Sequence, residues 1–527
     1  MHPYLRPLLS ASAAVCLITQ PASAKTEVPN IFGSNMVLQQ KQQNKVWGWD
    51  NAGTEITVTI AGQSKKAKVG ADGNWHVMLD PMDVGGPHQL NIAGKDKLVF
   101  DNVMIGEVWI CSGQSNMQWG LKSSNDGDLA ALTAHYPNIR LISVPQVGTD
   151  EPQNNFKGSW TTCTPETAPD FSAVGYYFGR QLHQSLGVPI GLIDNAWGGS
   201  ACEAWINRKV IDQDKRFKEL MEHWQGVEKH VKSGQADKDY EKSLAAWKVK
   251  ADEAKKNGKP EPRKPRNSNG NMTGNQRPAN IYNGVLRPTI GYGIKGAIWY
   301  QGESNAGRAY QYRDLFPLMI KNWRDEFKQG DFPFYWVQLA DFRAEKDAPA
   351  ESDWAELREA QTMTMSKLPN TGEAVIIDIG EANDIHPTNK LDVGNRLARW
   401  ALAKDYGIKG LAYRSPLYKS MEKKDGHIVA HFNHVGRGLD TVDVSNPLGF
   451  TIAGADKVFH HAQAEILGKG ADRNQVKVWS DKVKTPVAVR YAWADNPVCN
   501  VRNFDGLPLT PFRTDDWPGV TANKKSR

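Results

Sequence analysis

The sequence ICSGQSNMQW, from Ile110 to Trp119, follows the apolar run VMIGEVW at 103–109, which predicts a buried β-strand. Small and polar residues, including Gly113 and Ser115, stand where that strand should end. Glycine permits a sharp backbone turn, which would expose the Ser115 hydroxyl at the carboxyl edge of a sheet. Ser115 is therefore a candidate nucleophile, although a lone serine after a strand is more often a turn residue or a helix cap.

Strand-like and helix-like runs alternate between residue 103 and about residue 410. The runs that predict strands lie at 103–110, 139–144, 190–194, 296–300, 334–339 and 374–379. The runs that predict helices lie at 173–186, 310–327, 353–368 and 389–407. Such alternation implies a parallel sheet with helices on both faces. The predicted fold class of 103–410 is therefore α/β, with ligands bound beyond the carboxyl ends of the strands.

Two β-rich segments flank this region, and one polar segment interrupts it. Residues 25–102 and 411–527 contain short runs of β-branched and aromatic residues separated by turn sequences. The first is expected to form a β-sandwich or jelly-roll-like module, and the second a β-sandwich-like module. Residues 211–278 are rich in Lys and Glu and end in a loop rich in Pro, Asn and Gly, which predicts a helical insertion.

The composition indicates a globular protein. The 527 residues include 40% hydrophobic and 23% charged residues, and the net charge is +6. No basic stripe indicates nucleic-acid binding. Residues 1–24 combine one Arg, a short apolar stretch and an Ala-x-Ala-like end, which predicts a signal peptide cleaved near Ala24. That stretch is too short to span a membrane, so we expect an exported protein, periplasmic or secreted, without membrane insertion.

The cysteines match no metal motif. Beyond the expected signal peptide the chain has Cys111, Cys163, Cys202 and Cys499. Export permits disulfides, but the sequence leaves their pairing open, and free buried thiols are an equal alternative. Their spacing does not fit a zinc site, so we expect neither a metal nor another cofactor.

The motif NDIHP at 383–387 supplies partners for Ser115. Asp384 and His386 follow the last predicted strand, and residues i and i+2 of an extended backbone point the same way. A carboxylate in that position would hold the histidine tautomer and stabilise the charge that His386 gains when it takes the serine proton. Other candidate partners for His386 close in the sequence are Asp378, Glu381 and Asn383.

Acyl transfer also needs hydrogen-bond donors aimed at the oxygen that becomes negatively charged. The motif IDNAWGGSACEAW follows the third predicted strand and offers the backbone N–H groups of Gly198 and Gly199. The motif IWYQGESNA begins at the end of the fourth predicted strand and offers the side-chain amides of Gln301 and Asn305. With the N–H of Ser115, three strand ends would contribute donors to one site.

The motifs GQSNM, WGGS, YQGESN and DIHP, in this order, resemble the motif blocks of the SGNH/GDSL hydrolase superfamily, and more closely those of the sialate O-acetylesterase family. The resemblance extends to MVLQQ and GEVWICSGQSNM near the beginning and to VRYAWADNP and GLPLTPFRTDDWP near the end. It therefore covers nearly the whole chain. It implies a flavodoxin-like SGNH hydrolase domain, flanked by N- and C-terminal β-sandwich-like modules.

The resemblance also implies roles for single residues. They are Ser115 as nucleophile, His386 as base, Asp384 as its orienting acid and Gly199 as an oxyanion-hole glycine. The wider superfamily often has Asn in its third block and D-x-x-H in its last, whereas this chain has QGESN and D-x-H. Gln301 and Asn305 are therefore both candidates for the side-chain donor. We favour Gln301 because it lies nearer the strand end.

The implied activity is metal-independent removal of O-acetyl groups from sialic acid or related glycans, with an acetylated glycan as the partner. Arg308 is a candidate for binding the sialic acid carboxylate.

One alternative function is that of an acetyl esterase acting on plant xylan or xyloglucan. Another is a non-catalytic carbohydrate-binding protein, since the chain has 18 Trp residues. A serine peptidase or lipase is disfavoured because Met117 stands where a G-x-S-x-G elbow needs glycine. The glycan, the acetylated position and the oligomeric state are left open.

Overall fold

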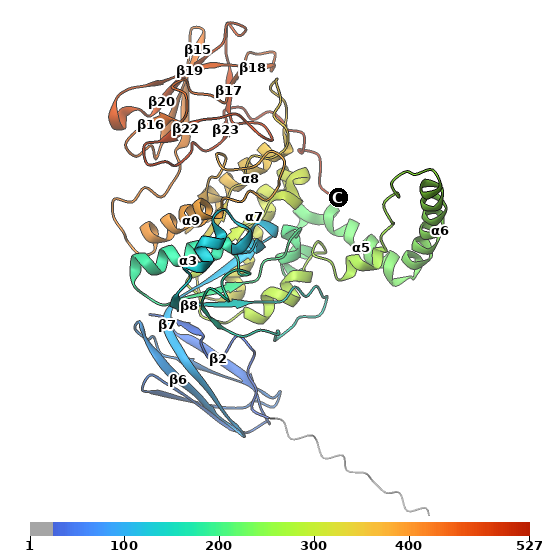
Figure 1. The fold of residues 1–527 in the computed structure, drawn as a ribbon, viewed down its shortest axis with the longest axis vertical. Coiled ribbons are helices and arrows are strands. Elements are labelled where there is room, and N and C mark those ends of the chain that lie inside the picture. The colour runs from blue at the N-terminus through green and yellow to red at the C-terminus, as the bar shows by residue number, and fades with distance from the viewer. Residues whose placement is uncertain (1–24, 527) are drawn as a thin grey trace, which may run out of the picture.

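The computed structural model describes residues 25–526, so the expected signal peptide at 1–24 lies outside the described residues. A central α/β region has a β module at each end (Figure 1). The N-terminal module, drawn in blue, and the C-terminal module, drawn in red, lie on opposite sides of the central helices. The α/β class and the presence of two further β modules agree with the sequence prediction.

One sheet organises the central region, with strands in the order β13-β12-β11-β7-β10-β8-β9. In that order their bounds are Thr371–Ala374, Phe334–Val337, Gly296–Tyr300, Lys97–Gly113, Ile190–Asp194, Tyr136–Ser143 and Thr161–Cys163. Neighbouring strands are parallel except for β8 and β9, which are antiparallel. The sheet is therefore mixed, because an antiparallel edge strand that the sequence did not indicate extends the parallel part.

Helices cover both faces of this sheet. On β7 the side chains of Trp109 and Cys111 pack in one core with residues of α3 (Ala173–Leu186) and α9 (Lys390–Lys404). The intervening Ile110 packs in another core with residues of α7 (Ala309–Phe327) and α8 (Asp353–Lys367). Because successive side chains of a strand point to opposite faces and both faces are covered, residues 103–113 are all buried.

Strand β7 also joins the N-terminal module to the central sheet. Its first part pairs with β6 (Gly85–Ala93), and Met104–Gly106 pair with β1 (Val37–Gln39). The other strands of the module are β2 (Asn44–Trp49), β3 (Glu55–Ile60), β4 (Gln63–Lys68) and β5 (Asn74–Leu79). The boundary expected after residue 102 thus lies inside one continuous strand, which both parts share.

The C-terminal module contains sheets of order β14-β15-β20-β19, β18-β17-β21-β23 and β16-β22. From β14 to β23 the bounds are Leu417–Lys424, His427–Asn433, Leu439–Thr441, Phe450–Ala453, Phe459–His461, Gln463–Leu467, Gln475–Trp479, Ala488–Tyr491, Val501–Asn503 and Phe512–Arg513. The core of this module also takes up Val375 and Ile377 from the central region.

That packing explains one wrong prediction. The run 374–379 was expected to be a strand, but β13 ends at Ala374. Val375 and Ile377 are buried against the C-terminal module instead of extending the central sheet. Both environments demand apolar side chains, so the composition of the run did not distinguish them.

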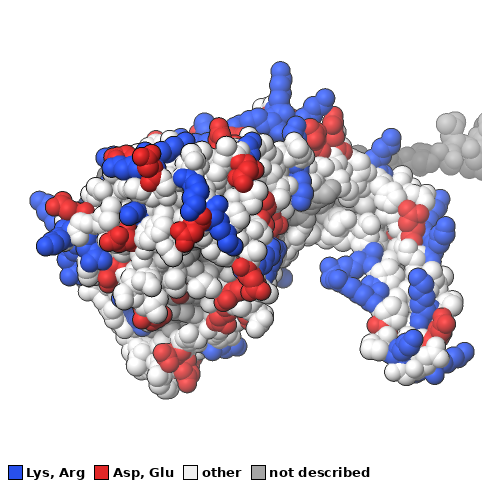
Figure 2. All heavy atoms as spheres, turned by 90° about the horizontal axis from the view of Figure 1, so that it is seen from above, with Lys and Arg blue, Asp and Glu red and all other residues white. Residues whose placement is uncertain are grey.

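The polar segment 211–278 is largely helical. The α-helices here are α4 (Arg208–Gln213), α5 (Lys218–Lys232) and α6 (Gln235–Lys256), and the 3₁₀ helices are η3 (Lys215–Phe217) and η4 (Ser268–Met272). Helices α5 and α6 project from the central region (Figure 1). Basic and acidic side chains are intermixed on the face that Figure 2 shows, including the projecting part. The two remaining α-helices are α1 (Ser115–Gln118) and α2 (Gly127–Leu132).

Cys111, Cys163, Cys202 and Cys499 are all free thiols, and the first three are buried. Within residues 25–526, none of the helices has the length and apolar character needed to cross a membrane.

Strand β7 ends at a position that only glycine can occupy. Gly113 has a φ of +134°, and a Cβ there would overlap the carbonyl oxygen of Tyr300. We predict that Gly113→Ala lowers the free energy of unfolding by at least about 1–3 kcal/mol, the usual cost of one such backbone strain. Thermal denaturation measures this loss.

Gly226→Ala is the matched control, because Gly226 lies in α5 and a Cβ there has no heavy atom within 4 Å. That change should be neutral or stabilise the helix by about 0.5–1 kcal/mol. Equal stability of the two variants would contradict the steric argument.

Candidate active site

Ser115 is the first residue of α1, directly beyond the carboxyl end of β7. The backbone leaves the strand at Gly113, and the N–H of Gln114 donates to the carbonyl oxygen of Tyr300 at the end of β11, 2.8 Å away. The start of the helix is therefore fixed to the neighbouring strand. This local geometry leaves Ser115 half-buried at the sheet edge.

His386 lies against Ser115 although 271 residues separate them in the sequence. The distance from His386 Nε2 to Ser115 Oγ is 2.8 Å. On the other side of the ring, His386 Nδ1 lies 3.4 Å from Asp384 Oδ1, and that oxygen also accepts a hydrogen bond from the His386 backbone N–H at 2.8 Å. The structure thus brings together the serine, the imidazole and the carboxylate that the sequence analysis singled out.

Two of the alternative acids near His386 have other partners. Asp378 forms a two-pronged interaction with Arg396, at 2.6 and 2.7 Å. Glu381 accepts hydrogen bonds from the N–H and the hydroxyl of Thr388, both at 2.7 Å. Asp384 is therefore the carboxylate that the loop presents to the imidazole.

An aromatic side chain also positions His386. The ring of Trp119 stacks on the imidazole, with centroids 5.0 Å apart and planes inclined by 17°. The indole Nε1 donates to the carbonyl oxygen of Ser123 at 2.8 Å, which fixes the Trp119 ring. Because the ring face is covered, rotation of the imidazole away from Ser115 is restricted.

A buried polar network connects the serine and histidine segments. The Asn116 side chain donates to the backbone oxygen of Ile385 at 2.9 Å and to Glu303 Oε1 at 2.7 Å. Lys390 Nζ donates to Asn116 Oδ1 at 2.5 Å. Asn116 directly follows Ser115, and Ile385 directly precedes His386, so this hydrogen bond connects the two segments. Lys390 holds the orientation of the Asn116 amide.

The charges of this network affect the histidine. Burial lowers the pKa of His386, Asp384 raises it and Lys390 lowers it further, and the net shift is downward. Burial also lowers the pKa of Lys390 to about 7, although Glu303, Glu381 and Asp384 favour its charged form. A neutral imidazole at neutral pH can accept a proton from Ser115.

Gly198 of the WGGS motif lies beside Ser115. A Cβ on Gly198 would lie 3.3 Å from the Cβ of Ser115, and the Gly198 N–H donates to Gln118 Oε1 at 2.8 Å. Gly199 adopts a φ of +71°. The N–H groups of Ser115 and Gly199 have no acceptor among residues 25–526, so both can donate to a ligand.

The two amides of the QGESN motif have partners inside the protein. Gln301 Nε2 donates to Ser200 O at 3.1 Å and to Asn305 Oδ1 at 2.8 Å, which uses both of its hydrogens. Asn305 Nδ2 donates to Glu203 Oε2 at 3.0 Å. Both side chains are buried. In this arrangement they hold the loop after β11 against the WGGS loop instead of pointing free donors at Ser115.

Arg308 is not placed to bind a substrate carboxylate. It is buried and pairs with Glu203 Oε1 at 2.6 Å, and it also donates to Gln311. Its charge is already neutralised within the protein.

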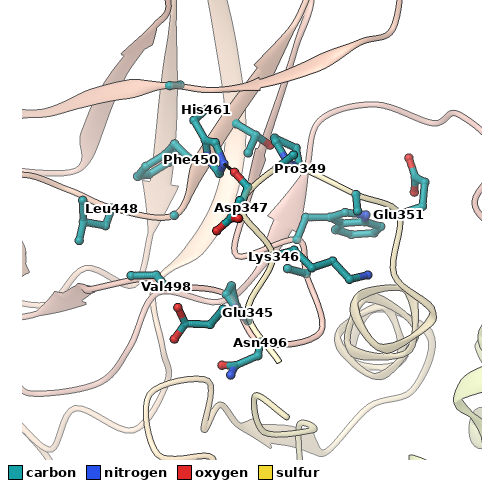
Figure 3. Close-up of a pocket in the computed structure, with 18 residues that line it drawn as sticks. Glu345, Lys346, Asp347, Pro349, Glu351, Leu448, Phe450, His461, Asn496 and Val498 are labelled. Carbon is teal, nitrogen blue, oxygen red and sulfur yellow. Dashed lines mark hydrogen bonds between the residues drawn. The ribbon is translucent and has the colours of Figure 1, made fainter. Parts of the chain in front are cut away.

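The cavity drawn in Figure 3 is separate from these residues. It has a volume of about 300 Å³ and lies between the loop 345–351 and the C-terminal module, where His461 Nε2 contacts the backbone oxygen of Asp347. Ser115, Asp384 and His386 do not line it. Across the described residues, no cluster of three or more His, Cys, Asp or Glu side chains could hold a metal ion.

Sequence reasoning missed Asn116, Trp119, Glu303 and Lys390. All four lie inside or next to the quoted motifs GQSNM, QGESN and DIHP. Their proximity to the motifs was the available signal, but their contacts depend on segments far apart in the sequence.

Known proteins resemble this chain along most of its length. Residues 105–250 and 275–403 match the family described as "Carbohydrate esterase, sialic acid-specific acetylesterase". The sialate O-acetylesterase of Homo sapiens is 30% identical over 547 residues, covering 93% of this chain and 94% of the human protein. That of Mus musculus is 30% identical over 451 residues, covering 77% and 79%.

A solved structure has the same fold. The crystal structure of a carbohydrate acetylesterase from Xanthomonas citri matches with a TM-score of 0.78 and 38% identity, over 94% of this chain and 100% of that one. Together with the site, these likenesses define a carboxylic ester hydrolase. The chain belongs to the sialic acid-specific acetylesterase family of carbohydrate esterases.

The charge of Lys390 should be measurable at His386. We predict that Lys390→Met raises the pKa of His386, because a cation that disfavours the imidazolium is removed while Asp384 stays. NMR titration of the imidazole protons measures this pKa without reference to turnover.

Lys404→Met is the control, since Lys404 lies in the last turn of the same helix. It should leave the pKa of His386 unchanged. An unchanged or lower pKa in Lys390→Met would contradict the electrostatic argument.

Proposed function

We propose that the protein is a serine carbohydrate O-acetylesterase of the SGNH type, with Ser115 as nucleophile, His386 as general base and Asp384 as orienting acid. The observation that carries this proposal is the 2.8 Å contact between His386 Nε2 and Ser115 Oγ at the carboxyl edge of the central sheet. Membership of a carbohydrate esterase family supports it.

The reaction follows from this arrangement. Ser115 Oγ attacks the acetyl carbonyl carbon while His386 Nε2 takes the hydroxyl proton. The tetrahedral intermediate collapses, the sugar oxygen leaves and takes the proton from His386, and an acetyl group remains on Ser115. A water molecule then loses a proton to His386 and attacks the acetyl carbon. Collapse of this second tetrahedral intermediate breaks the bond to Ser115 Oγ, which takes the proton back from His386, and acetic acid leaves and ionises to acetate. Asp384 stabilises the imidazolium in both steps, and the cycle needs no cofactor.

We propose that backbone groups form the oxyanion hole. The N–H groups of Ser115 and Gly199 have no acceptor among the described residues, and Gly198, the neighbour of Gly199, packs against Ser115. The Gln301 amide, in contrast, uses both hydrogens internally. This proposal differs from the sequence-based preference for Gln301 as donor. In it, Gln301 and Asn305 support the loops that present the backbone donors.

The proposed substrate is an O-acetylated sialic acid or related glycan. Relatives named sialate O-acetylesterase favour this class over acetylated xylan or xyloglucan. We also propose export to the periplasm or outside the cell, on the basis of the signal-peptide pattern in residues 1–24.

Removing the nucleophile tests the proposal. Ser115→Ala should lower kcat/KM for a small aryl acetate by about 10³-fold or more, with an unchanged melting temperature. The same change at the exposed Ser366 of α8 should affect neither quantity. Turnover close to that of the natural protein in a folded Ser115→Ala variant would exclude Ser115 as nucleophile.

The role of the QGESN amides is tested separately. Gln301→Ala and Asn305→Ala should each cost about 1–3 kcal/mol of stability, because each leaves buried polar partners unsatisfied. The kcat of the folded enzyme should fall by less than about tenfold. Melting temperature and aryl acetate kinetics measure the two effects. A loss of about 10²–10³ in kcat at an unchanged melting temperature would instead identify the substituted amide as the oxyanion donor.

A further inference from the structure

A cavity of about 500 Å³ lies between α5 and the loop at 266–276. His223, Trp224 and Val227 of α5 line one side, and residues of the Asn- and Gly-rich loop line the other. This volume is within the range of about 300–1,000 Å³ that ligand pockets usually have.

The cavity adjoins the candidate active site through two loop residues. Asn275, which lines the cavity, donates from Nδ2 to the carbonyl oxygen of Gly198 at 2.5 Å. Gln276, which also lines it, donates to the carbonyl oxygen of Gly199 at 2.9 Å. Because Gly198 packs against Ser115, one glycine turn separates the cavity from the nucleophile.

The lining combines polar and apolar groups, and it contains no carboxylate. It offers side-chain amides, the guanidinium of Arg266 and an aromatic ring at Trp224. The Trp224 side chain is 4% exposed, and its Nε1–H has no acceptor within the part of the chain that the structure describes. Amides can donate to and accept from sugar hydroxyls, and an unpaired indole N–H can donate to one.

Part of one side of the cavity lies outside the family match. The family match stops at residue 250 and resumes at residue 275, so it omits the stretch that contains Arg266, Gly270 and Asn271. Helix α5, on the other side, lies within the matched residues. The loop therefore adds a wall to a surface that the family pattern covers only in part.

We propose that this cavity is a subsite for a sugar unit linked to the acetylated one, so that the protein acts on glycan chains in preference to single sugars. This inference rests on the proposed function, because the cavity is placed relative to Ser115. The occupant is a saccharide, since side-chain amides, one guanidinium and an unpaired indole N–H meet at a cavity next to the glycine turn.

Gly270 offers a direct way to fill the cavity. It lines the cavity, its φ is not positive, and a Cβ there has no heavy atom within 4 Å. Gly270→Phe should therefore add bulk without backbone strain. Gly226→Phe is the matched control. Gly226 lies on α5, which forms the other side of the cavity, but it does not line the cavity itself, and a Cβ there also has no heavy atom within 4 Å.

Binding of unacetylated sugars to the full chain tests the subsite independently of hydrolysis. Calorimetry compares 3′-sialyllactose with N-acetylneuraminic acid, and xylotriose with xylose. In at least one of these two pairs, the trisaccharide should bind at least about tenfold more tightly than the corresponding monosaccharide. Gly270→Phe should abolish this preference, and Gly226→Phe should retain it.

Melting temperatures confirm that both variants fold, and Asn271→Ala, at an exposed cavity position, should reduce the preference if Gly270→Phe is unstable. Two outcomes overturn the inference: neither trisaccharide binds better than its monosaccharide, or the preference survives in Gly270→Phe. Failure of the proposed function would show differently, as aryl acetate hydrolysis that persists in Ser115→Ala.

Discussion

The close contact between Gly113 and the carbonyl oxygen of Tyr300 determines where the chain leaves β7. Strand β7 is buried from residue 103 to residue 113 and pairs with β10 on one side and β11 on the other. Its end therefore has little freedom to move. The serine two residues further on takes its position from this strand, and the same strand continues backwards into the N-terminal module.

The histidine segment has no such strand to hold it. The chain leaves the central sheet after Ala374 and packs partly against the C-terminal module before it reaches His386. Side-chain contacts replace the strand: Asn116 donates to the Ile385 carbonyl, Lys390 donates to Asn116, and Trp119 stacks on the imidazole. Buried polar groups are costly unless they are paired, so this network favours one arrangement of the two segments.

The two loops that complete the site have different structural roles. Gly198 of the WGGS loop packs against Ser115, and the QGESN loop supports the WGGS loop through the buried Gln301 amide. The helical insertion then contacts the outer side of the same glycine turn through Asn275 and Gln276. Changes in the insertion can thus alter the surroundings of the site while β7 and the histidine network stay as they are.

The sequence by itself determined the α/β class, the flanking β modules, the positions of the main helices and the motifs of the site, because these depend on local patterns. A short continuous apolar run identified β11, and helical periodicity identified α3, both at their observed bounds. A two-residue spacing was enough to pair Asp384 with His386.

Tertiary structure alone decided which hydrogen-bond donors near Ser115 lack a partner within the protein. Gln301 looked available in the sequence, but its partners Ser200 and Asn305 come from other turns of the chain. It also decided that residues 375–377 leave the sheet and that Lys390 lies under the site, because burial and pairing across distant segments leave no local signature.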